Sequence, residues 1–387
     1  MLNFSEIDQL IKVAFYAYGE NGRVGLPLFF VSPPGEAKTS KVRGVARAAG
    51  VWFGALEGSR LDAVDVAGLP KFSDDGRSFR FVPPAVLRDA ADAGDGLLFL
   101  DELTRAPASV QAAFLTLLLE GRTEGVQLPP GVRIMAAANP AASVGGVELD
   151  PANASRLIWI DWPAMDADEF TAYLLGADTV TGEARRVPID HAAEAERLER
   201  DWPANMMRAR GAVAGFLASK GSLLREPAPE QARGWSNPRT WSMATRALAA
   251  CYMHGASERV LHTLLAGALG AGTATAFAAW LRSSDLPSAR DVLAGKAALP
   301  LDARRKDRTL SVLAECIAIG NVQDHGLRLW ELVGEAATVS PELTVLSIRM
   351  LKARDMGFLI VRSPAKVQLL TNPAFSRIME EVANAKP

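Results

Sequence analysis

The chain has 387 residues, of which 49% are hydrophobic, 22% charged and 7% aromatic. A chain this apolar can bury a sizeable core, which excludes a largely disordered protein. The formal net charge of -2 excludes a global basic field, so nonspecific nucleic-acid binding is not expected.

The composition also favours the cytoplasm. Cys251 and Cys316 lie too far apart in sequence to suggest a disulfide framework or a zinc site, which fits a reducing compartment. The first residues are mixed and acidic, unlike a signal peptide. The apolar runs, such as 96–100 and 134–138, are shorter than the roughly 20 residues that span a bilayer. We therefore expect a cytoplasmic protein without a membrane segment.

The first part of the chain predicts a parallel α/β sheet. Residues 7–18 carry one apolar stripe with helical spacing, which predicts an amphipathic helix. The apolar run 27–31 then ends in Ser-Pro-Pro-Gly, and a helical pattern follows over 37–49. A buried strand, a glycine turn and a helix in this order are typical of the first unit of such a sheet.

Three more buried strands are predicted over 96–100, 132–138 and 157–160. A helix with an apolar face around Phe114 separates the first two of them. This alternation predicts a wound sheet with helices on both of its faces.

Two segments look like insertions into this pattern. Asp75-Gly76 lies between alternating aromatic and polar residues over 72–81, which is a hairpin signal. A second hairpin is predicted over 121–131, just before the strand at 132. Neither segment is expected to join the sheet.

After residue 163 the strand patterns disappear and helical patterns dominate. We therefore predict an α/β domain with its N-terminal helix over 1–164, a helical domain over 165–297, and a C-terminal helical segment over 298–387.

The most informative motif is the octet 32–39, which lies between the first predicted strand and its helix. A P-loop lies at this place, because a helix N-terminus offers free N–H groups and a positive dipole end to phosphate. Lys38 could reach the β- and γ-phosphates, and Thr39 could hold Mg²⁺ through its hydroxyl. Ser32 and Ala37 stand where the P-loop pattern has its first and last glycines.

Polar residues follow two later strands. The strand at 97–100 ends in Asp101-Glu102. Asp101 would hold Mg²⁺, and Glu102 would polarise the attacking water as a general base or orienting group. Asn139 ends the next strand, where its amide can position water or touch the γ-phosphate.

Two arginines complete the candidate set, because the planar, permanently charged guanidinium suits phosphate oxygens. Arg156 begins the last predicted strand, and Arg239 begins a helix of the helical domain. One of them could act within the subunit and one across an interface between subunits.

This ordered set resembles the AAA+ ATPases, and most of all their MoxR group. Gly35-Glu36-Ala37-Lys38-Thr39 resembles the MoxR P-loop, in which Ala often precedes the lysine, and 101–107 is similar to the Walker B segment. Asn139 falls at sensor 1, 149–157 resembles the segment that ends in the arginine finger, and 237–239 resembles sensor 2. The two hairpins resemble the helix-2 insert and the pre-sensor hairpin.

The resemblance implies a P-loop AAA+ domain followed by an all-α lid domain, with ATP and Mg²⁺ as cofactors and ADP and phosphate as products. It implies Glu102, Asn139, Arg156 and Arg239 as catalytic residues, and Thr39 and Asp101 as the Mg²⁺ ligands. The residues implied to bind the nucleotide are Pro34, Gly35, Glu36, Ala37, Lys38, Thr39, Ser40 and Asp101.

The resemblance further implies a ring, a hexamer, in which ATP sits between subunits and Arg156 of a neighbour reaches the γ-phosphate. Within a subunit, ATP would lie in the cleft between the α/β and helical domains. The ring would remodel or mature a protein partner, often one with a von Willebrand factor A domain, and the inserts would face a central pore or that client.

Two alternatives remain open. Ser32 and Glu36 motivate a nucleotide-binding scaffold with little turnover, because a Glu36 carboxylate that points at the phosphates would weaken binding. If it points to solvent, it matters little. The presence of both acids, Asn139 and both arginines favours turnover. A nucleic-acid-stimulated motor is disfavoured by the near-neutral charge.

Overall fold

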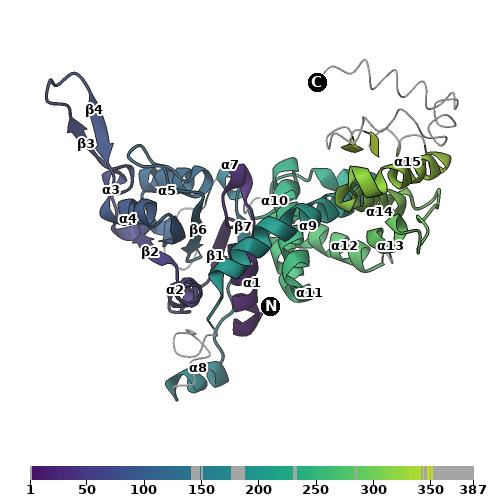
Figure 1. Cartoon of the computed structure of the whole chain (residues 1–387). Helices are drawn as coiled ribbons and strands as arrows, with labels where there is room; N and C mark the ends of the chain where they lie inside the picture. The colour runs from purple at the N-terminus through teal and green to yellow at the C-terminus, as the bar shows by residue number, and fades with distance from the viewer. Residues whose placement is uncertain are drawn as a thin grey trace. The chain divides into compact units, whose positions relative to one another are not determined.

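The computed structural model describes residues 2–140, 149, 151–175, 188–229, 233–283, 286–340, 343, 347, 348, 350 and 351 (Figure 1). The chain divides into two compact units. The first consists of Met1–Trp202 and Arg225–Thr275, and the second of Pro203–Leu224 and Ala276–Pro387.

The first unit is built on a five-stranded parallel sheet in the order β2-β5-β6-β1-β7. Its strands are β1 (Leu28–Val31), β2 (Trp52–Glu57), β5 (Asp95–Asp101), β6 (Gly131–Ala138) and β7 (Ile158–Asp161). Phe29 pairs with Ala136 on one side and with Trp159 on the other, so β1 lies in the interior of the sheet. The four predicted strands are confirmed as a parallel sheet, and β2 is a fifth strand that the sequence analysis did not predict.

Helices cover both faces of the sheet, which explains why its strands are apolar at consecutive positions. The helices of this unit are α1 (Phe4–Phe15), α2 (Lys38–Ala48), α3 (Ala63–Ala67), α4 (Ala85–Ala93), α5 (Ala108–Glu120), α7 (Pro151–Ala154), α8 (Ala167–Leu174), the first part of α9 (His191–Ser219), α10 (Pro238–His254), α11 (Glu258–Leu269) and the first part of α12 (Ala271–Ser283). Phe29 and Leu98 share one core cluster with Leu87 of α4 and Phe114 of α5. Phe30 follows Phe29 in the chain and is equally buried, but it lies outside that cluster.

The parallel order gives the sheet two different edges. At its carboxyl edge the chain leaves β1 into 32–37, leaves β5 after Asp101 and leaves β6 at Asn139. At its amino edge the chain enters β1 at residue 28 and β7 at residue 158. The two edges carry different polar side chains, and both are described below.

The first predicted insertion is a two-stranded hairpin of β3 (Leu69–Phe72) and β4 (Phe79–Val82) that projects from the α/β unit (Figure 1). The second, over 121–131, is shorter than predicted, because its strands pair only through an isolated bridge between Arg122 and Gln127. Pro129 and Pro130 follow the bridge and lack the N–H groups that a longer ladder would need.

Buried polar contacts tie the amino edge to the helices around it. Arg133 of β6 is 2% exposed, forms an ion pair with Asp95, and donates from Nε to the Phe15 carbonyl at 3.1 Å. His191 contacts Asp95 through Nε2 at 3.0 Å and the Tyr16 hydroxyl through Nδ1 at 2.9 Å. Burial raises the pKa of the Tyr16 hydroxyl above its usual value.

The second unit is helical in the part that the structure describes. It holds the remainder of α9 and α12 together with α13 (Ala289–Leu293), α14 (Lys306–Ile319) and α15 (Val322–Val339). Its core is lined by apolar residues of these helices, and Trp280 donates from Nε1 to the Asp307 carboxylate at 2.7 Å. The predicted boundaries at 164 and 297 remain predictions, and most of 352–387 lies outside the described residues.

No helix in the described part of the chain has both the length and the apolar character needed to cross a bilayer.

We expect the Arg133→Met substitution to lower the free energy of unfolding by about 2–3 kcal/mol, because it leaves the Phe15 carbonyl without its donor and Asp95 without its ion pair. The matched control is Arg88→Met, whose ion pair with Asp92 on α4 joins two side chains that are each 65% exposed. It should cost at most about 0.5 kcal/mol. Urea unfolding followed by circular dichroism measures both, and equal losses would contradict the structural role of Arg133.

Candidate functional site

The loop between β1 and α2 has an unusual backbone. Gly35 has φ of +90°, which glycine adopts readily, but Ala37 also has a positive φ, of +54°. Among the described residues, the only other non-glycine residue with positive φ is Glu102, at +53°. A left-handed alanine costs about 1–2 kcal/mol. Both strained residues lie at the same edge of the sheet, and strain of this kind concentrates at functional sites.

Ala37 is the N-cap of α2 and makes no side-chain capping bond. The first N–H groups of α2 therefore lack the side-chain acceptor that usually caps a helix, and they face the loop. Such a helix start is an anion-binding position.

Lys38 begins α2 and is only 7% exposed. Its ammonium donates to the Ser32 carbonyl at 3.1 Å, the Ser32 hydroxyl at 2.8 Å, the Pro33 carbonyl at 3.2 Å and Asn139 Oδ1 at 3.2 Å. Burial lowers the pKa of Lys38, and the nearby carboxylates, Asp101 first, oppose that shift. Ser32, at the place of the first P-loop glycine, thus supplies two of the acceptors that hold the lysine inside the loop.

The end of β5 brings its two acids to this loop. The Thr39 hydroxyl donates to Asp101 Oδ2 at 2.5 Å, and the other oxygen of Asp101 accepts from the Glu102 N–H at 2.8 Å. The Glu102 carboxylate is about one quarter exposed and lies 3.3 Å from the Arg105 guanidinium. The left-handed conformation of Glu102 turns the chain sharply after β5.

Asn139 ends β6 and is 5% exposed. Its amide oxygen accepts from Lys38, and its carbonyl accepts from the Thr104 hydroxyl at 3.1 Å. Asn139 therefore connects the phosphate loop with the turn that follows Glu102.

These residues surround one hollow of about 300 Å³ at the carboxyl edge. Among described residues, those that line it are Pro34, Gly35, Glu36, Ala37, Lys38, Thr39, Ser40, Glu57, Asp101, Glu102 and Asn139. The structure thus brings together every predicted site residue except the two arginines. Glu57, at the end of β2, is the one described lining residue that the sequence analysis missed. An acidic residue at the end of a strand is the sequence signal that could have identified it.

The side chain of Glu36 is held at its outer end. Its Oε2 accepts from the Met165 N–H at 3.0 Å, and its carbonyl accepts from Trp162 Nε1 at 2.8 Å. The carboxylate thus connects the loop to the chain after β7, yet it still lines the hollow.

Thr39 and Asp101 fit a magnesium ion. Their oxygens meet at the hollow, and Mg²⁺ prefers such hard oxygen ligands, with water and phosphate completing its octahedron. In the described residues no group of three or more His, Cys, Asp or Glu side chains forms a metal cage.

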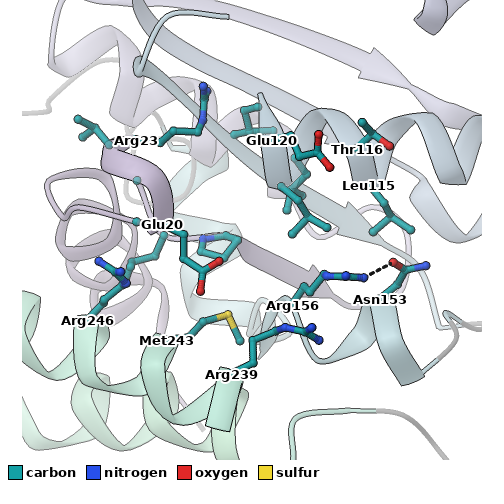
Figure 2. A pocket seen from close by; sticks show the side chains of 18 of the residues that line it. Glu20, Arg23, Leu115, Thr116, Glu120, Asn153, Arg156, Arg239, Met243 and Arg246 are labelled. Carbon is teal, nitrogen blue, oxygen red and sulfur yellow. Dashed lines mark hydrogen bonds between the residues drawn. The ribbon is translucent and has the colours of Figure 1, made fainter. Parts of the chain in front are cut away.

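Arg156 and Arg239 lie elsewhere, in a pocket of about 450 Å³ that we call the amino-edge pocket (Figure 2). Arg156 precedes β7, whose first residue pairs with the first residue of β1, so it lies at the end of the sheet opposite to the phosphate loop. The pocket is also lined by residues 23–27, which lead into β1. The structure brings the two arginines to each other and not to the hollow of their own chain.

One short segment holds both guanidiniums. Arg156 Nη1 donates to Asn153 Oδ1 at 3.2 Å (Figure 2). Arg239 Nη1 donates to the Ser155 hydroxyl at 2.9 Å. Asn237 fixes the start of α10, because its side chain accepts from the N–H groups of Arg239 and Thr240 in a capping box. The cap places Arg239 in the first turn of α10, facing the pocket.

Two further arginines line the amino-edge pocket, and the sequence analysis missed both. Arg23 donates to the carbonyls of Leu128 at 3.1 Å and Val132 at 2.8 Å, and Arg246 lies two turns after Arg239 on α10. The spacing of Arg239 and Arg246 by seven residues places them on one helix face and was the available signal for Arg246.

Comparison with known proteins supports the assignment of the first unit. Residues 28–159 match the model of the ATPase family associated with various cellular activities (AAA). This span contains both acids, Asn139 and Arg156, but ends before Arg239. The predicted fold class, an AAA+ α/β domain followed by a helical region, is confirmed.

No protein of curated function matches the chain in sequence. Among solved structures, the chain is similar to the 2.00 Å crystal structure of an ATPase candidate from Cytophaga hutchinsonii. The sequence identity is 16% and the TM-score 0.45, over 68% of this chain and 80% of that chain. A likeness at this level does not extend to function.

We expect Glu36→Gln to tighten ADP binding by about two- to fivefold, because it removes a negative charge near the phosphates and keeps the acceptor for Met165. Glu36→Ala removes the acceptor as well and should bind ADP more weakly than Glu36→Gln. Calorimetric titration measures both. Glu124→Gln, at an exposed position outside the hollow, is the control, and weaker binding by Glu36→Gln would contradict this interpretation.

Proposed function

We propose that the chain is an ATPase that works as a ring of identical copies, with each nucleotide held at the carboxyl edge of one copy and completed by the arginines of the next. The observation that carries this proposal is the separation of the two groups. The loop, the acids and Asn139 line one edge of the sheet, and Arg156 and Arg239 line the pocket at the other.

The hollow at the carboxyl edge would bind the triphosphate. The N–H groups at the start of α2 and the buried Lys38 ammonium would replace water around the phosphate oxygens. Lys38 would exchange its carbonyl acceptors for phosphate oxygens. Its buried positive charge would then be paired with a negative charge. Thr39 and Asp101 would hold Mg²⁺, which neutralises charge on the phosphates.

Glu102 would orient the attacking water and accept its proton, and Asn139 would hold that water or the γ-phosphate in line. In the free chain Glu102 lies beside Arg105. Among the described residues that line the hollow, Lys38 is the only basic one, so further positive charge for the outer phosphate oxygens would come from outside the hollow.

Arg156 and Arg239 supply that charge if a neighbouring copy places its amino-edge pocket against the hollow. A repeated contact between unlike edges is heterologous, and such a contact closes into a ring when its rotation allows. We assign both arginines to the neighbour's nucleotide, because Asn153 and Ser155 hold them side by side.

We further infer a MoxR-type role, in which a hexamer remodels or matures a protein client in the cytoplasm, with a von Willebrand factor A domain as the candidate client. Ala37 before Lys38 and the β3–β4 hairpin support this role. The hairpin exposes Leu69 by 63%, Phe72 by 66% and Phe79 by 56%, and exposed apolar groups of this kind mark a contact surface. The free, buried thiols of Cys251 and Cys316 support a reducing compartment.

The experiment that tests the proposal mixes inactive variants. Glu102→Gln should lower the ATPase rate by at least about 10²-fold while ATP stays bound. Arg156→Gln should lower it by about 10³-fold. Each variant keeps one intact edge, so an equimolar mixture should regain up to about a quarter of the parent rate, because a quarter of the contacts join an intact hollow to an intact pocket.

Two control mixtures sharpen this test. Glu102→Gln with Thr39→Ala has both lesions at the carboxyl edge and should regain nothing. Arg156→Gln with Arg239→Gln should also regain nothing if both arginines serve the neighbour, whereas recovery would show that Arg239 acts within its own chain. No recovery in the first mixture would contradict catalysis between copies, and ATP binding without turnover in the parent protein would favour the scaffold.

We expect the double substitution of Phe72 and Phe79 by Ser to leave the basal ATPase rate unchanged, because the hairpin lines neither the hollow nor the amino-edge pocket. It should abolish stimulation by an unfolded polypeptide, for which reduced carboxymethylated α-lactalbumin is the probe. Asp74→Asn, at the exposed turn of the same hairpin, is the control and should keep the stimulation. A double variant that is stimulated like the parent would contradict the client role of the hairpin.

A further inference from the structure

The two outer strands of the sheet differ in how they are covered. β7 has four residues, and α11 packs so closely on it that a Cβ at Gly267 would lie 2.2 Å from the Trp159 carbonyl oxygen. β2 has six residues and pairs with β5 on one side. Among the described residues, no other strand pairs with its outer side. The outer N–H and C=O groups of β2 are therefore available to a further strand.

The sequence of β2 lacks the features that usually protect an edge strand. Such strands are commonly short, or carry a lysine, a proline or a bulge that prevents pairing with another chain. β2 has the sequence Trp-Phe-Gly-Ala-Leu-Glu, and its one charged residue, Glu57, is the last. Its register with β5 runs without interruption from Trp52 opposite Gly96 to Glu57 opposite Asp101, so the strand has no bulge. The outer edge of β2 is thus a regular template for strand pairing.

A groove of about 580 Å³ lies at this edge. Its described lining consists of Arg43 and Arg47 from α2 and of Val51, Phe53, Gly54 and Ala55. Side chains alternate between the two faces of a strand. Trp52 and Leu56 pack in the core on one face, so Phe53 and Ala55 point to the face on which the two arginines lie. Cover is incomplete there, because Phe53 is half-buried and Ala55 is exposed.

Arg43 gives the groove a positive charge next to an aromatic ring. Its guanidinium carbon lies 5.3 Å from the centroid of the Phe53 ring. The side chain is exposed and forms no ion pair in the described part of the chain. A guanidinium that contacts a ring through its face can still donate from its in-plane N–H groups to a carboxylate. Arg47 makes interactions of its own, so we assign the contact with a carboxylate to Arg43 alone.

We propose that β2 binds an extended segment of a protein partner, which adds a sixth strand to the sheet and places an acidic side chain at Arg43. Main-chain hydrogen bonds would supply affinity, and alternate side chains would supply selectivity. A second copy of β2 fits less well, because antiparallel pairing about a twofold axis would place both Arg43 side chains on the same face, where they would repel each other.

This inference goes beyond the proposed function, because it needs neither a bound nucleotide nor a ring. It also gives the partner a place beside the nucleotide site. β2 ends in Glu57, and Glu57 lines the hollow at the carboxyl edge. The added strand would therefore lie next to the hollow of the same chain.

The test uses the full chain without nucleotide, and the probe is a fluorescein-labelled peptide of sequence Thr-Val-Glu-Val-Glu-Val-Glu-Thr. Fluorescence anisotropy should show saturable binding at one site. A peptide with Gln in place of each Glu should bind about two- to fivefold more weakly, and Arg43→Glu should weaken binding of the acidic peptide by about tenfold. Arg88→Glu, at an exposed position of α4 outside the groove, is the control and should not change the binding.

A second measurement separates strand pairing from charge attraction and needs no variant of the protein. The N–H groups of a strand point alternately to its two sides. N-methylation of alternate peptide residues should therefore abolish binding in one of the two phases and leave it unchanged in the other. No saturable binding, equal loss in both phases, or binding that Arg43→Glu leaves unchanged would overturn the proposal. A parent chain that forms a dimer strengthened by Arg43→Glu would also overturn it, in favour of a second copy at β2.

Discussion

The parallel pairing of β1 with both β6 and β7 is the constraint on which the rest of the structure depends. Parallel strands deliver all of their carboxyl ends to one edge, so a loop after β1, two acids after β5 and an amide after β6 converge without any long excursion of the chain. The same polarity sends whatever precedes β7 to the far edge. The parallel strand direction therefore produces two chemically distinct sites. One holds the phosphate loop and the two acids, and the other is rich in arginine.

Three residues at the carboxyl edge are held in energetically unfavourable states. Lys38 is desolvated against neutral oxygens, and Ala37 and Glu102 both adopt backbone conformations that L-residues avoid. The hydrophobic core on both faces of the sheet, in which Phe29 and Phe30 are fully buried, stabilises the fold enough to hold these residues in place. The backbone of the site is thus in place before an anion arrives, which is the general advantage of preorganisation, and Lys38 would then only have to exchange its acceptors.

Sequence reasoning identified the parts that depend on local order. The loop around Lys38, the acids 101 and 102 and Asn139 could be placed because each directly follows an apolar strand, and strand ends are local signals. It also found Arg156 and Arg239, but it could not place them together at the amino edge. That needs the strand order and the contact between Arg239 and Ser155, which are 84 residues apart. Arg23 belongs to no motif and became visible only from the pocket that it lines, whereas Glu57 was missed because β2, the strand that it ends, was not predicted.

β5 has seven residues, and the six intervals between them, at about 3.3 Å each, span roughly 20 Å. Asp95 begins it, fastened by Arg133 and His191, and Asp101 ends it beside the phosphate loop. Because β5 is hydrogen-bonded to β2 on one side and to β6 on the other, it resists sliding along its own axis. The fastening of Asp95 at one end of β5 therefore helps to fix the position of Asp101 at the other end, beside the phosphate loop.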